Sequence, residues 1–209
     1  MNKQTSKTFF ILSPFLVLLI TQASALLFGR YLGPRVYIPI ITIYWVVMSF
    51  ILYKYGCNHI RSWFKKPQGH WIWIIIAVLV GFSSLPLFLQ HYKVLLDLSI
   101  LIPTVIFVLI NPWLEEFYWR GMLLDVTAKW PAWVSILFST ILFTLIHSAF
   151  AWHSPATRNV TFYLAVFFLG LMMALIYKKT KSLWLTILSH MMINLLNLSI
   201  PSLLGMIEF

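Results

Sequence analysis

The stretch Asn111-Pro112-Trp113-Leu114-Glu115-Glu116-Phe117-Tyr118-Trp119-Arg120-Gly121 places two adjacent carboxylates and a guanidinium inside a long apolar run. Ionisable groups at hydrocarbon depth are costly, and where they occur they mark functional sites by default. On a helix, Glu116 and Arg120 lie four residues apart and share a face, which allows an ion pair. Glu115 points roughly 100° away, along a row with Asn111 and Trp119. The stretch therefore predicts one carboxylate neutralised by its own helix and a second one offered to a cavity.

The composition around this stretch is that of a membrane protein. The 209 residues are 61% hydrophobic and 10% charged, with a mean hydropathy of +0.88, whereas soluble domains are about half apolar and a quarter charged. Seven apolar runs are each long enough to cross a bilayer. They lie near 9–29, 37–55, 71–90, 98–127, 132–150, 160–177 and 183–200. We therefore expect an all-α, polytopic transmembrane helix bundle with about seven spans.

The net charge of +10 indicates how the chain is oriented. In a soluble protein this excess would suggest nucleic acid, but here the basic residues lie mostly between apolar runs. Topology and anionic lipid headgroups account for them, and no nucleic-acid partner is expected. One set of connectors holds Lys3, Lys7, Lys54, Arg61, Lys65, Lys66, Lys129, Lys178, Lys179 and Lys181, and the other holds Arg30, Arg35, Lys93 and Arg158. The positive-inside rule therefore predicts a cytoplasmic N-terminus.

Aromatic residues and one proline give further expectations. Pro112 removes a backbone donor just before the glutamates, which predicts a kinked or locally broken helix beside a cavity. The connector 57–69, which carries Trp63, is expected to be an interfacial anchor. The other Trp and Tyr residues are expected mainly in interfacial belts and in packing.

Three polar residues in other apolar runs are candidates for the same site. His147 ends the fifth run, and His190 and Asn194 lie four residues apart on one face of the seventh. Glu115 and His147 are each sixteen residues from the turn near Pro131, so an antiparallel pair of helices would bring them to similar depth. Taken singly, each of these residues would be explained by hydrogen bonding between helices or by a role in a proton relay. Their coincidence on three runs predicts a single polar site.

The residue types of this site fit the hydrolysis of a peptide bond. A carboxylate and an imidazole can hold and deprotonate a water molecule. A second imidazole with a neighbouring amide can stabilise the negative oxygen that develops on the carbonyl.

The spacing of these residues resembles the three motifs of a known family. Glu115-Glu116-x-x-x-Arg120, Phe143-x-x-x-His147 and His190-x-x-x-Asn194 are similar to those of the CPBP (Abi) family of intramembrane proteases. That family contains CAAX prenyl endopeptidases and bacterial bacteriocin-processing and immunity proteins. The resemblance covers roughly residues 95–200, so residues 1–94 are expected to be N-terminal helices and 95–209 the catalytic helices of one membrane domain.

The resemblance also implies roles for individual residues. Glu115 and His147 would activate water, His190 and Asn194 would form the oxyanion hole, and Glu116 and Arg120 would support them. Phe117, Tyr118 and Trp119 are bulkier than the residues usual between these two motif positions. They are expected to narrow the cavity.

Whether a metal takes part is open at this point. Glu115, His147 and His190 would suit zinc with a water in the fourth position. The alternative mechanism for the family is metal-free activation of water by the glutamate, which we favour. The sequence lacks the His-Glu-x-x-His, Gly-x-Gly-Asp and Gly-x-Ser-x-Gly patterns of other intramembrane proteases.

Three functions remain in view. The first is an endopeptidase that cuts a membrane-associated peptide or protein in the bilayer of a bacterial plasma membrane. The second is a non-catalytic bacteriocin-immunity or regulatory protein of the same family. The third is a small proton-coupled transporter that uses the carboxylates and histidines as a relay, although no inverted repeat of broken helices is present in the sequence.

Overall fold

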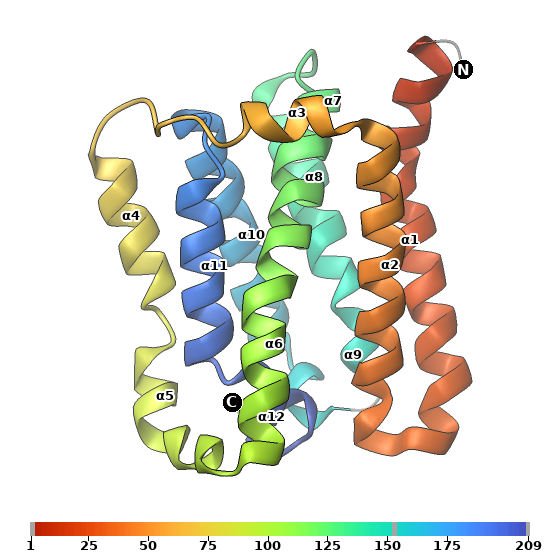
Figure 1. Ribbon diagram of the computed structural model, residues 1–209, viewed down its shortest axis with the longest axis vertical. Helices are drawn as coiled ribbons and strands as arrows, with labels where there is room; N and C mark the ends of the chain where they lie inside the picture. Colours follow the sequence, from red (N-terminus) through yellow and green to blue (C-terminus); the bar gives the residue numbers. More distant parts are fainter. Residues whose placement is uncertain (1–2, 152–153, 208–209) are drawn as a thin grey trace.

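The computed structural model describes residues 3–151 and 154–207, and these residues form a bundle of helices with no strand (Figure 1). The first part comprises α1 (Lys3–Leu32), η1 (Gly33–Val36), α2 (Tyr37–Tyr55), α3 (Cys57–Ser62), α4 (Ile72–Gly81), α5 (Leu85–His91) and η2 (Tyr92–Leu96). The second comprises α6 (Leu98–Glu115), η3 (Glu116–Met122), α7 (Leu123–Val126), α8 (Ala132–Ile146), α9 (Ser148–Ala151), η4 (Pro155–Thr157), α10 (Val160–Thr180), α11 (Trp184–Leu196) and α12 (Ser199–Leu203). The predicted all-α membrane bundle is confirmed.

The described residues contain five helical stretches long and apolar enough to cross a membrane. They are Lys7–Tyr55, Ile72–Leu96, Leu98–Val126, Ala132–Ala151 and Val160–Thr180. The first of them, 49 residues long, contains both α1 and α2, which fold back on each other as a hairpin (Figure 1). The seventh predicted run is represented by α11, a shorter apolar helix.

The third predicted span is not one continuous helix. It divides into α4 and α5, and the turn between them covers Phe82, Ser83 and Ser84. Pro86 lies in the first turn of α5, where its missing N–H costs no intrahelical hydrogen bond. Only 11% of an 18-residue apolar segment of this span is buried in the bundle, so this element lies at its periphery. The break therefore sits on a side wall of the bundle.

The fourth span departs from α geometry, but not at the residue expected. Pro112 lies inside the continuous helix α6, whose N-terminus is capped by the Asp97 carboxylate accepting from the Ser99 N–H. The departure comes at η3, which is a π-helix, and there the Leu123 N–H bonds the Tyr118 carbonyl five residues back. The Trp119 carbonyl is released by this shift and accepts from the Ser139 hydroxyl at 2.8 Å. Such π segments occur frequently at functional sites.

The predicted helix 183–200 is also interrupted. It ends as α11 at Leu196, and the chain turns through Leu198, which has a φ of 51°. This left-handed conformation costs a non-glycine residue about 1–2 kcal/mol, and the burial of the Leu198 side chain offsets the cost. The turn separates α12 from α11 and so places Asn197 and Ser199 at the rim of a cavity.

The connector 57–69 was expected to be an interfacial anchor, and that expectation was wrong for its central residue, Trp63. Trp63 is only 1% exposed. Its indole N–H donates to Asp125 at 2.8 Å, and its carbonyl accepts from the Leu183 N–H at 2.9 Å. Gly121 lies so close that a Cβ there would come within 2.7 Å of the Trp63 ring. The connector is therefore packed onto the end of the bundle where α3 and α7 lie (Figure 1).

Candidate active site

The candidate site is built on two consecutive glutamates that face different partners. Glu115 is the last residue of α6 and Glu116 the first of η3, and they are 4% and 0% exposed. Glu116 Oε1 lies 3.1 Å from Arg120 Nη1, so the predicted ion pair is present. Glu115 instead lines a cavity. As expected, one carboxylate is paired with an arginine of its own helical segment and the other faces a cavity.

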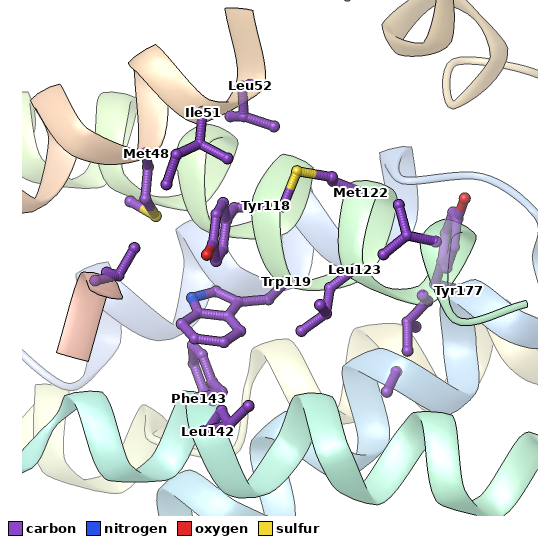
Figure 2. Close-up of a cluster of buried hydrophobic side chains, with 14 of the residues drawn as sticks. Met48, Ile51, Leu52, Tyr118, Trp119, Met122, Leu123, Leu142, Phe143 and Tyr177 are labelled. Carbon is purple, nitrogen blue, oxygen red and sulfur yellow. The ribbon is translucent and has the colours of Figure 1, made fainter. Parts of the chain in front are cut away.

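Arg120 is held by an aromatic ring as well as by Glu116. Its guanidinium lies 4.2 Å from the centroid of the Phe143 ring, a cation–π contact worth about 2 kcal/mol in a desolvated setting. The ring of Phe143 also packs edge-on against His147, with centroids 4.8 Å apart, and against Trp119 at 6.0 Å. Figure 2 shows Trp119 and Phe143 side by side in a cluster of buried hydrophobic side chains. The buried charge pair therefore has an aromatic wall instead of water.

His190 of α11 bridges the two glutamates. Its Nδ1 lies 2.9 Å from Glu116 Oε1, and its Nε2 lies 3.3 Å from Glu115 Oε2. Because Glu116 is paired with Arg120 and accepts, Nδ1 is the donor in the first contact. The resemblance implied that this histidine helps to form an oxyanion hole, whereas both of its ring nitrogens here face carboxylates.

His147 reaches the same cavity from the end of α8. Its Nδ1 is 2.8 Å from the Phe143 carbonyl, which can only accept, so Nδ1 carries the proton and donates. In the neutral imidazole this leaves Nε2 unprotonated. The ring is partly exposed and lines the cavity with Glu115. A neutral His147 therefore offers a proton acceptor.

Asn194 lines the cavity one helical turn beyond His190. Its side chain is 5% exposed, and within residues 3–151 and 154–207 its amide nitrogen has no hydrogen-bond partner. A buried donor without a partner costs roughly 1–3 kcal/mol, and such an exception calls for an explanation such as a ligand or a water. The amide is therefore free to donate to a substrate.

The cavity has a volume of about 100 Å³. A cavity of roughly 10–15 Å³ is enough to hold a water molecule, so the space has room for water. Four predicted site residues line it, namely Glu115, His147, His190 and Asn194, whereas Glu116 and Arg120 lie behind the wall. His153, which from the sequence is expected to be a loop residue able to reach the same mouth, is outside the described residues.

Tyr44 of α2 is a site residue that the sequence analysis assigned to belts and packing. It is 3% exposed and lines the cavity, and its hydroxyl donates to Glu115 Oε1 at 2.9 Å. The Trp119 indole N–H donates in turn to the Tyr44 oxygen at 2.8 Å. Trp45 likewise donates to Asn111 at 2.9 Å. Their central position in a span, away from both interfaces, was the available signal.

A three-ligand metal centre does not fit this arrangement. Among the residues that the structure describes, no group of three His, Cys, Asp or Glu side chains is disposed to hold one ion. Glu115 and His190 face each other directly, and the second nitrogen of His190 is occupied by Glu116. We therefore derive no step through zinc.

One comparison with known proteins finds a similar family. Residues 97–196 match the family described as type II CAAX prenyl endopeptidase Rce1-like, a segment that contains all three motifs and runs from α6 to α11. No curated protein and no solved structure matches the chain. Through residues 97–196, just under half of its length, the chain is similar to the Rce1-like family of type II CAAX prenyl endopeptidases, a family of membrane proteases.

Proposed function

We propose that this protein is an intramembrane endopeptidase that hydrolyses a peptide bond of a membrane-associated peptide or protein. The observation that carries the proposal is the meeting of Glu115, His147 and Asn194 on one cavity of about 100 Å³ inside an apolar bundle. Amide hydrolysis requires groups that hold and deprotonate a water molecule, here Glu115 and His147. It also requires a donor for the oxyanion, here the unpartnered amide of Asn194.

In the proposed reaction, a water molecule is held between the Glu115 carboxylate and Nε2 of His147. The water oxygen attacks the carbonyl carbon of the scissile bond and gives one proton to Nε2. The Asn194 amide donates a hydrogen bond to the oxyanion that forms. The proton then passes from Nε2 to the leaving nitrogen as the carbon–nitrogen bond breaks, which releases an amine and a carboxylic acid.

The remaining residues position this machinery. His190 holds Glu115 on one side, and Glu116 with Arg120 fixes His190 on the other. All groups that the reaction needs come from the chain itself, so we propose that the activation of water is metal-free. We propose that the protein resides in a bacterial plasma membrane. A cytoplasmic N-terminus is supported by the basic residues, which predominate at the end of the bundle that carries the N-terminus.

The test compares the peptides released by cells or proteoliposomes that contain wild type, Glu115→Gln or His147→Ala. Both variants should insert into the membrane at normal abundance and lose cleavage by at least about 10²-fold, the low end for loss of a general base. Exposed Tyr53→Phe on α2 is a matched control and should cleave normally. Equal cleavage by all four proteins would refute the proposal, and a protective phenotype that survives Glu115→Gln would favour the non-catalytic relative.

A further inference from the structure

The cavity is closed at its glutamate end and open at the other. Glu115, Phe143 and His190 are at most 5% exposed, whereas Phe162, Asn197 and Ser199 on the same wall are partly exposed. The exposed rim belongs to the part of the bundle where α12 and η4 meet, joined by a hydrogen bond from the Ser154 hydroxyl to the Ser202 carbonyl. Figure 1 shows α12 at the end of the bundle opposite to the N-terminus.

A groove continues this opening to the side of the bundle. Its volume is about 360 Å³, and it runs between the α4–α5 break, with Ser83 and Ser84, and the start of α10, with Thr161. The groove and the cavity share five wall residues, which are Phe162, Val166, Leu169, Ile193 and Asn197. Irregular backbone at membrane depth is tolerated where it lines a cavity. The break in the third span is therefore placed at an entrance.

The end of the bundle that carries the N-terminus is sealed. Trp63 is buried against Gly121 and tied to Asp125 and to the backbone of Leu183. Next to it, four rings pack on one another with centroids 5.0 to 5.9 Å apart. They belong to Phe64, Trp113, Phe117 and Trp184. A peptide cannot reach Glu115 from this side without displacing the connector.

The charges assign the two ends to the two sides of the membrane. The sealed end carries the lysine-rich connectors. The connector 57–69 lies beside the end of α10, because the Gln68 N–H donates to the Thr180 carbonyl at 2.8 Å. The open end carries only four basic residues, Arg30, Arg35, Lys93 and Arg158. By the positive-inside rule the sealed end faces the cytoplasm, and the open end faces outward.

We propose that the substrate is an extended peptide segment at the outer side of the membrane, which enters the site through the groove between α5 and α10. The proposal rests on the proposed function. The groove suits this occupant because its walls combine apolar side chains, such as Leu87 and Val166, with hydroxyl and amide groups on Ser84, Thr161 and Asn197. An extended peptide presents side chains to the first kind of wall and unpaired backbone groups to the second.

The test is labelling of single cysteines with a membrane-impermeant maleimide. Cys57, the only cysteine in the chain, is replaced by serine. Ser199→Cys reports on the rim, Ser84→Cys reports on the groove, and exposed Lys66→Cys in the sealing connector is the control. In intact cells, Ser199→Cys and Ser84→Cys should react and Lys66→Cys should not. In inverted membrane vesicles the pattern should reverse.

Two results would overturn the proposal. The first is reaction of both reporters in inverted vesicles alone, which would place the entrance on the cytoplasmic side. The second is failure of both to react in either preparation, which would mean that no aqueous path reaches the groove. Labelling requires no turnover, so the same reporters in a Glu115→Gln background separate the route of entry from the proposed chemistry. Cleavage that survives Glu115→Gln removes the enzyme mechanism and leaves the labelling result standing.

Discussion

The hydroxyl of Tyr44 donates a hydrogen bond to Oε1 of Glu115 across 2.9 Å. The direction of this bond is fixed, because the Trp119 indole can only donate and already gives its proton to the Tyr44 oxygen. The Tyr44 hydroxyl carries a single proton, and it is donated in the hydrogen bond to Glu115. One carboxylate oxygen is thereby held, and the other is turned toward His190. Tyr44 lies outside the segment that matches the family, so this orientation of the carboxylate comes from the N-terminal helices.

Tyr44→Phe should therefore lower kcat without unfolding the protein. A hydrogen bond to a charged group contributes about 1.5–3 kcal/mol, and each 1.36 kcal/mol is a factor of ten in rate, so we expect a loss of roughly ten- to hundredfold. KM should change little, because the hydroxyl acts through Glu115. Steady-state cleavage kinetics check this, with Tyr53→Phe on the same helix as control. Unchanged kcat in Tyr44→Phe would show that Glu115 is oriented by other groups.

Glu116→Gln should destabilise the bundle, because it leaves the buried Arg120 without its countercharge. Removing one partner of a buried pair costs about 3–5 kcal/mol. The double variant Glu116→Gln with Arg120→Gln removes both charges and should recover much of the lost thermal stability, measured as the midpoint of unfolding in detergent. It should remain poorly active, since His190 then faces a neutral amide in place of the Glu116 carboxylate. A double variant no more stable than Glu116→Gln would contradict this account.

Asn194→Leu should lower kcat more than it lowers affinity. The unpartnered amide is assigned to the oxyanion, and loss of one such donor costs about 10²–10³ in kcat. Stability should hold or rise, because a buried unsatisfied donor is replaced by an apolar side chain of similar size. Asn197→Leu, at the rim of the same cavity, is the comparison and should affect KM more than kcat. Equal kcat in wild type and Asn194→Leu would assign the oxyanion to another donor.

Gly121→Ala should loosen the connector that closes the sealed end. The new methyl group would lie 2.7 Å from Cε2 of Trp63, and overpacking of this kind costs about 1–3 kcal/mol. Unfolding midpoints measure the loss. In a Trp63→Phe background the smaller ring leaves room, so the same glycine substitution should cost less. Equal costs in the two backgrounds would mean that Trp63 does not limit the space at Gly121.

Chelators should leave cleavage unchanged. The mechanism uses His147, Glu115 and Asn194 alone, and no three-ligand cluster is formed among the described residues. Purified enzyme treated with a chelator should retain its rate, and elemental analysis should find less than one zinc per chain. A loss of activity that is restored by zinc would overturn the metal-free step, whereas the assignment of an endopeptidase would stand.

The sequence by itself determined the membrane bundle, the pairing of Glu116 with Arg120 and the convergence of the polar runs. These follow from local physics. The cost of charge in lipid and the four-residue spacing on a helix act within single segments, and three motifs in order then gave the family.

Only the tertiary structure decided which atoms meet and how the site is reached. The Tyr44–Glu115 bond joins residues 71 positions apart, and the central position of Tyr44 in an apolar span does not by itself name Glu115 as its partner. Packing between helices likewise explains three local irregularities. They are the π-helix after Glu115, the left-handed turn at Leu198 and the break before α5. Each costs local stability and is stabilised by neighbours distant in the chain. For that reason the open and closed ends of the cavity could not be predicted from the sequence.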